Sequence, residues 1–184
     1  MEFRFVGYPP AWAPWAVAIA AYVNFFTHHY GPDIRIALFA LSVMAFAPNA
    51  VPKLEEIAER HPGLRMIIDH MGLNSSLRGK SLEPAVANTL KFARLRNVAV
   101  KVSALPCYVD EPYPFPTLHP IVRRVVDAFG PQRCFWGTDL SHLPCPYKQV
   151  VTLFTEEIKS LSAFELEWVM GRGIAEWLGW PLSE

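Results

Sequence analysis

From about residue 43 onward, apolar and polar residues alternate in blocks that predict β-strands, each followed by an α-helix. Short apolar runs cover residues 43–47, 64–69, 98–102 and 134–136. A continuous run of this kind is typical of a strand that is buried on both faces, as strands are in parallel sheets. Alternation of such strands with amphipathic helices predicts an α/β fold built on a parallel sheet.

Between these runs, apolar residues recur at helical spacing and predict five helices, at about residues 52–61, 83–94, 122–129, 147–161 and 166–178. Five prolines between residues 106 and 120 predict an irregular loop there. The inward faces are expected to carry Leu54, Ile57, Ala58 and His61; Val86, Leu90 and Ala93; Val122, Val125, Val126 and Phe129; Val150, Val151, Phe154 and Ile158; and Leu166, Val169, Met170, Gly173, Ile174, Trp177 and Leu178.

The spacing of the strands suggests a particular α/β architecture. Three predicted strands end at His70, Ser103 and Asp139, which are 33 and 36 residues apart. A (β/α)₈ TIM barrel of about 250 residues averages roughly 31 residues per unit. Because only four units can be identified in 184 residues, we expect a partial barrel over residues 43–184. Residues 1–42 form a separate, atypical apolar segment without a clear period.

A partial barrel has two open sheet edges, which the N-terminal segment or a second copy of the chain would have to cover. We therefore expect a homo-oligomer as one way of covering these edges. Residues 11–26 are almost entirely apolar, but Pro14 and Asn24 interrupt them, so a membrane span is not favoured.

The overall composition excludes several classes of function. Lys plus Arg and Asp plus Glu both number 17, so no basic excess points to nucleic acid. The three cysteines contain no C-x-x-C pair, which argues against a disulfide framework and against a cysteine zinc site. We expect a cytoplasmic protein with a small-molecule substrate.

Polar residues follow the predicted strands where a parallel sheet would bring them together. Right-handed βα units place all strand carboxyl ends on one rim, so His70, Ser103 and Asp139 should converge there. An imidazole and a carboxylate on one rim can hold a divalent metal or activate water. The alternatives are that Asp139 caps a helix or holds a turn and that His70 is a hydrogen-bonded structural residue.

Four neighbouring residues are candidates for substrate binding. A charge within an apolar strand is costly unless it is paired, so Lys101 either binds an anionic substrate, pairs across the barrel or extends to solvent. Ser103 lacks a G-x-S-x-G context and is not expected to be a nucleophile. His142 could line a pocket or cap a helix, and Tyr147 could reach the rim or simply pack.

Four motifs in this order resemble the amidohydrolase-related family (amidohydrolase 2), and in particular its 2-pyrone-4,6-dicarboxylate lactonase-like branch. They are residues 67–72 (IIDHMG), 97–103 (NVAVKVS), 136–139 (WGTD, with His142 behind) and 170–179 (MGRGIAEWLG). The resemblance covers about residues 43–181, the C-terminal half of such a barrel. The family's opening His-x-His triplet does not occur in this chain, and the adjacent His28 and His29 do not replace it.

The resemblance implies a (β/α)₈ barrel in which His70 follows the sixth strand and Asp139 follows the eighth. In relatives, that acid accepts a proton from the attacking water or positions it. Some members hold zinc or manganese, which His70 and Asp139 would bind here, whereas the lactonase-like branch can work without metal. The expected function is hydrolysis of a lactone or small carboxylate substrate. The alternatives are a decarboxylase of the same family and a non-enzymatic barrel remnant that needs a partner.

Overall fold

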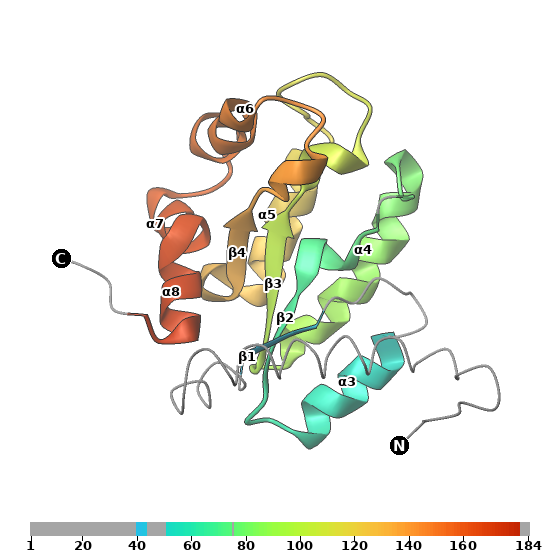
Figure 1. Cartoon of the computed structure of the whole chain (residues 1–184), viewed down its shortest axis with the longest axis vertical. Helices are drawn as coiled ribbons and strands as arrows, with labels where there is room; N and C mark the ends of the chain where they lie inside the picture. Colours follow the sequence, from blue (N-terminus) through green and yellow to red (C-terminus); the bar gives the residue numbers. More distant parts are fainter. Residues whose placement is uncertain (1–39, 44–50, 75, 181–184) are drawn as a thin grey trace, which may run out of the picture. The chain divides into compact units, whose positions relative to one another are not determined.

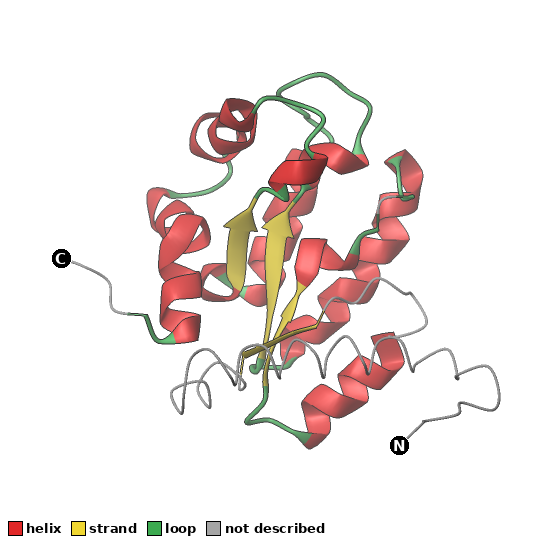
Figure 2. Ribbon diagram, viewed as in Figure 1, coloured by secondary structure: helices red, strands yellow, loops and turns green. Residues whose placement is uncertain are grey.

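The structure is a computed structural model that describes residues 40–43, 51–74 and 76–180 (Figures 1 and 2). In these residues, strands and helices follow one another as the hydrophobic pattern predicts, apart from shifts of a few residues at their ends. The elements are β1 (Ala40–Val43), α3 (Val51–Arg60), β2 (Arg65–Ile68), α4 (Leu82–Leu90), β3 (Val98–Ser103), α5 (Leu118–Phe129), β4 (Cys134–Gly137), α6 (Tyr147–Thr152), α7 (Ala163–Glu167) and α8 (Gly173–Leu178).

The strands of the described residues form one sheet in the order β1-β2-β3-β4, and every neighbouring pair is parallel. This confirms the parallel α/β class, while the barrel itself stays a prediction. Arrowheads of β3 and β4 point toward the same end of the sheet, where loops and short helical turns gather (Figure 2). The strand predicted at residues 43–47 begins earlier and covers Ala40–Val43; residues 44–47 lie outside the described residues.

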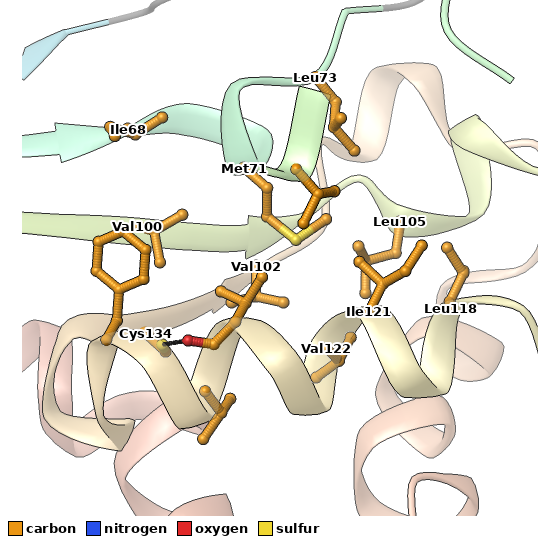
Figure 3. Packing of buried hydrophobic residues seen from close by; sticks show 14 of the residues in the cluster. Ile68, Met71, Leu73, Val100, Val102, Leu105, Leu118, Ile121, Val122 and Cys134 are labelled. Carbon is orange, nitrogen blue, oxygen red and sulfur yellow. Dashed lines mark hydrogen bonds between the residues drawn. The ribbon is translucent and has the colours of Figure 1, made fainter. Parts of the chain in front are cut away.

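One face of the sheet carries the main hydrophobic core. Alternate strand residues, such as Val100 and Val102, pack there against α5, whose side chains Ile121 and Val122 point toward β3 (Figure 3). The Cys134 thiol on β4 donates a 3.8 Å hydrogen bond to the Val125 carbonyl of the same helix. All four predicted inward residues of this helix are buried, which confirms its face: Val122, Val125, Val126 and Phe129.

The opposite face of the sheet carries a smaller apolar cluster, and polar residues follow it toward the carboxyl ends of the strands. Ile67 of β2, Ala99 of β3 and Phe135 of β4 form this cluster, and Trp177 of α8 packs against it. The rings of Phe135 and Trp177 are 5.9 Å apart. Because side chains alternate along a strand, the residues two positions further on share this face. These are Asp69, Lys101 and the small Gly137, and Ser103 shares the same face two positions beyond Lys101.

Three helix predictions need correction. In α3, Ala58 is buried as expected, but Ile57 is 41% exposed and His61 lies exposed beyond the helix end. The inward stripe of α3 is therefore narrower than its apolar pattern suggested. The predicted helix 166–178 is interrupted by a wider π-helical turn at Trp168–Arg172. The predicted helix 147–161 ends in such a turn at Leu153–Glu157, and residues 158–161 are not helical.

Two predictions from composition can be compared with the structure. All three cysteines, Cys107, Cys134 and Cys145, carry free thiols, which confirms that they form no disulfide framework. Across the described ranges, none of the helices is both long and apolar enough to cross a membrane. Residues 1–39, which hold most of the predicted apolar segment and the His28-His29 pair, lie outside the description.

Candidate active site

His70 stands on a tight turn directly after β2. The chain leaves the strand at Ile68 and forms a 3₁₀ turn over Asp69–Gly72, in which His70 and Met71 have φ values of 52° and 55°. Left-handed backbone of this kind is uncommon for residues other than glycine and often marks functional sites. The Thr89 hydroxyl of α4 donates a 2.6 Å hydrogen bond to the Met71 carbonyl and anchors the turn to the helix. His70 is only 9% exposed.

Gly72 ends this turn and is required there for two reasons. Its φ is +69°, and a Cβ atom at this position would lie 2.6 Å from the Thr89 hydroxyl oxygen. Gly72→Ala should therefore destabilise the protein by about 2 kcal/mol or more, because it adds a steric clash to the left-handed strain. Gly79 also has a positive φ, +52°, but nothing lies within 4 Å of its added Cβ. Gly79→Ala should cost only about 1 kcal/mol.

Urea denaturation of both glycine variants measures the two contributions separately. A larger loss of unfolding free energy at position 72 than at position 79 is expected, with unchanged m-values. Equal losses at the two positions would show that the packing of Thr89 against the turn contributes nothing.

Asp139 lies beside His70, although the two residues are distant in the sequence. It follows β4 with φ 55°, and its Oδ2 atom is 3.6 Å from the Nε2 atom of His70. Its Oδ1 atom is 3.4 Å from the Nδ1 atom of His142. The Asp139 side chain is 33% exposed and that of His70 11%. The structure thus places an imidazole and a solvent-accessible carboxylate next to each other, at the carboxyl ends of β2 and β4, the two strands that flank β3.

Ser103 contacts the other nitrogen of the same imidazole. Its Oγ atom is 2.8 Å from His70 Nδ1, and the residue is 1% exposed. Gly137 on β4 pairs with Ser103, and a Cβ atom at position 137 would lie 3.1 Å from the Ser103 Cβ atom. A larger residue there would press on Ser103. The serine hydroxyl therefore contacts His70, and its predicted contact with a substrate stays a prediction.

Lys101 forms an ion pair on the same face of the sheet. Its Nζ atom is 2.7 Å from Oδ1 of Asp69, whose side chain is 8% exposed. Of the alternatives for this lysine, the structure shows pairing across neighbouring strands. The ammonium compensates a carboxylate that would otherwise be costly to bury. Because the lysine side chain is 35% exposed, it still has a surface that an anionic group could contact. The cost of burying a charge indicated that Lys101 needs a partner, but the sequence did not identify Asp69 as that partner.

The surroundings of His70 favour its neutral form. Burial lowers the pKa of His70 most, and the Lys101 charge lowers the pKa further, against the opposing effects of Asp69 and Asp139. A histidine with a pKa below its ordinary value of about 6.5 is mostly uncharged at neutral pH. It can then donate or accept a hydrogen bond without first losing a proton.

The two remaining predicted residues are both exposed, and of these two the structure shows His142 in contact with Asp139. His142 is 73% exposed at its side chain and contacts Asp139 and Ser141. Tyr147 is 52% exposed and packs edge-on against Trp136, with ring centroids 6.4 Å apart. Sequence reasoning did not include Cys107, whose thiol donates a 3.2 Å hydrogen bond to the His142 carbonyl and ties the loop after β3 to the loop after β4.

The predicted metal was tested against the ligands that these residues offer. In the portion of the chain that the structure describes, no group of three or more His, Cys, Asp or Glu side chains could hold a metal ion. Catalytic zinc normally takes three protein ligands. His70 and Asp139 provide two potential ligands, so the described residues do not complete such a site.

Comparison with known proteins identifies the family. The family described as amidohydrolase matches residues 7–180. The chain belongs to the amidohydrolase family. The match starts well before residue 43, so the family similarity extends further toward the N-terminus than the four motifs indicated.

The relatives include enzymes named as hydrolases. An L-fucono-1,5-lactonase of Burkholderia ambifaria is 38% identical over 95 residues, which are 50% of this chain and 31% of that protein. A Burkholderia multivorans amidohydrolase crystallised with bound zinc is 21% identical, with a TM-score of 0.67 over 96% of this chain and 73% of that one. A putative 2-pyrone-4,6-dicarboxylic acid hydrolase of Pseudomonas putida is 22% identical, with a TM-score of 0.53 over 78% and 63%. The two structural matches show a shared fold.

Proposed function

We propose that this amidohydrolase opens a lactone, or cleaves a small carboxylate ester, with water activated between His70 and Asp139. The observation that carries the proposal is the 3.6 Å approach of His70 Nε2 to Asp139 Oδ2 on a rim of parallel strands. Enzymes with parallel strands commonly place their catalytic groups at the carboxyl ends of the strands. The lactonase relative supports this substrate class, although the match spans less than a third of that relative's length.

The proposed reaction begins with Asp139 as general base. Its carboxylate accepts a proton from a water molecule, and the water oxygen attacks the carbonyl carbon of the substrate. The imidazole of His70 polarises the carbonyl oxygen by a hydrogen bond, which stabilises the negative charge that develops there. The carbon–oxygen bond of the lactone then breaks. The protonated Asp139 returns its proton to the departing alkoxide, so the product is a hydroxy acid.

The other predicted residues are assigned to substrate orientation. The Lys101 side chain is partly exposed on the same face as Ser103, and we propose that its positive charge attracts an anionic substrate group. His142 lies beside Asp139 and is exposed, and Tyr147 is exposed next to Trp136, so we assign both to contacts with the rest of a small molecule. We also propose that the sheet belongs to a (β/α)₈ barrel whose edges are covered by the remaining chain or by a second copy.

Titrating the acid that is released tests the reaction class. The purified chain should release one proton equivalent per molecule of sugar 1,5-lactone or dicarboxylate lactone, at a rate above that of spontaneous hydrolysis. A parallel measurement of dissolved carbon dioxide distinguishes hydrolysis from decarboxylation. Acid release without carbon dioxide supports the proposal. Release of carbon dioxide from an unsaturated acid, with no lactone opening, would favour the decarboxylase instead.

A further inference from the structure

We propose that Ser103 fixes the tautomer of His70 by donating its hydroxyl proton to Nδ1, so that the imidazole proton resides on Nε2. The two atoms are 2.8 Å apart, and both residues are buried. A neutral imidazole carries one proton, so one ring nitrogen donates a hydrogen bond and the other accepts one. The hydroxyl can act in either sense. The direction of the bond between Ser103 and His70 therefore determines which of the two ring nitrogens carries the proton.

The burial of Ser103 decides the direction of the bond. If Nδ1 carried the ring proton, the serine oxygen would accept the bond and its own proton would need another acceptor. Ser103 is 1% exposed, and the only side-chain hydrogen bond of its hydroxyl within the described residues is the one to His70. A buried hydroxyl left without an acceptor loses its hydration without compensation. Donation from the hydroxyl to Nδ1 avoids that loss.

The position of Asp139 favours the same tautomer independently. Its Oδ2 atom is 3.6 Å from Nε2 of His70. A carboxylate beside this nitrogen stabilises a proton on it and repels a lone pair. A choice between tautomers exists only for the uncharged imidazole, so it is defined at a pH above the ordinary histidine pKa.

Close packing holds Ser103 in the required place. Its partner across the β3–β4 ladder is Gly137, and any side chain at position 137 would begin 3.1 Å from the Ser103 Cβ atom. The serine therefore stands against the neighbouring strand on one side and against His70 on the other. Ser103 is accordingly a positioning residue, which acts on the reaction through the imidazole.

The tautomer has a consequence for chemistry at Nε2. A protonated Nε2 donates a hydrogen bond to a carbonyl oxygen, but it has no lone pair with which to ligate a metal ion. This disagrees with a zinc or manganese ion on Nε2 of His70, which would require the Ser103 bond to reverse. The role as donor to the substrate carbonyl rests on the proposed function, whereas the tautomer does not.

Nitrogen-15 NMR of the histidine-labelled chain reads the tautomer directly and needs no substrate. Long-range spectra at about pH 8, above the ordinary histidine pKa, distinguish protonated from unprotonated ring nitrogens. His70→Asn assigns the signals, because the chain has six histidines and only one set should disappear. In the parent protein we expect a protonated Nε2 and an unprotonated, hydrogen-bonded Nδ1. A protonated Nδ1 in the parent would overturn the inference.

Removing the hydroxyl tests the part played by Ser103. In Ser103→Ala, the Nδ1 signal should move toward that of a nitrogen without a hydrogen bond, and the two tautomers should become mixed. Tyr113→Phe is the control, since it removes a hydroxyl that bonds Thr152 and Glu157 outside the site, and it should leave His70 unchanged. Identical His70 signals in Ser103→Ala and the parent would contradict the proposal. If Ser103→Ala fails to fold, the tautomer of the parent still decides it.

Discussion

Asp139→Asn is expected to reduce kcat/KM for lactone hydrolysis by about 10²- to 10⁴-fold, the range typical of losing a general base. The substitution is nearly isosteric but removes the capacity to accept a proton from water. Asparagine also suits the backbone, since Asp139 has φ 55° and asparagine tolerates left-handed conformation better than alanine does. The variant should therefore fold as the parent does. Initial rates of acid release, together with urea denaturation, provide the two measurements.

Asp110→Asn is the matched control for this prediction. Asp110 lies in the loop after β3, its side chain is 89% exposed, and its ion pair with Arg78 is long, at 3.8 Å. The same chemical change at that position should leave kcat/KM within about twofold of the parent, because a surface ion pair contributes little. If Asp139→Asn keeps more than about a tenth of the parental rate, then Asp139 is not the base.

Arg133→Met is expected to lower the free energy of unfolding by about 3 kcal/mol, because hydrogen bonds from a charged group to buried acceptors are among the strongest. The guanidinium of Arg133 is half-buried just before β4. It donates to the carbonyls of Ala93, Leu95, Val98 and Phe129 at 2.7–2.9 Å. It thereby joins the start of β3 to the end of α5. Methionine keeps most of the apolar stem but leaves those four carbonyls without this donor.

The neighbouring Arg96 provides the comparison for this stability effect. It is exposed and lies one residue beyond Leu95, in the same connection between α4 and β3. Arg96→Met should change the unfolding free energy by no more than about 0.5 kcal/mol, as surface substitutions usually do. Urea midpoints with m-values measure both variants. Similar losses for the two arginines would mean that loss of positive charge, rather than of the four hydrogen bonds, destabilises the protein.

The sequence predicted the sheet and the meeting of the site residues for one physical reason. Buried parallel strands give continuous apolar runs, and parallel strands deliver their carboxyl ends to one edge. His70, Ser103 and Asp139 could therefore be expected together from the ends of three runs. A second pattern, the regular helical spacing of apolar residues, identified the buried face of α5.

Other features depend on contacts that no local pattern contains. The left-handed backbone at His70 and Asp139 is imposed by the turns that follow β2 and β4. Neither residue is glycine, the residue type that would have indicated such a conformation in the sequence. Ile57 fits the apolar stripe of α3 but stays exposed, because burial depends on what packs against a helix as well as on its spacing. The Asp69–Lys101 pair required knowing which residues on adjacent strands share a face and lie within reach.

A double-mutant cycle on kcat/KM tests most directly whether His70 and Asp139 act on the same bond. The four proteins are the parent, His70→Asn, Asp139→Asn and the double variant, and asparagine suits the left-handed backbone at both positions. Residues that work as one unit lose about as much singly as together. We therefore predict that the double variant hydrolyses lactone about as slowly as the slower single variant. Losses that multiply in the double variant would contradict a joint role for the two residues.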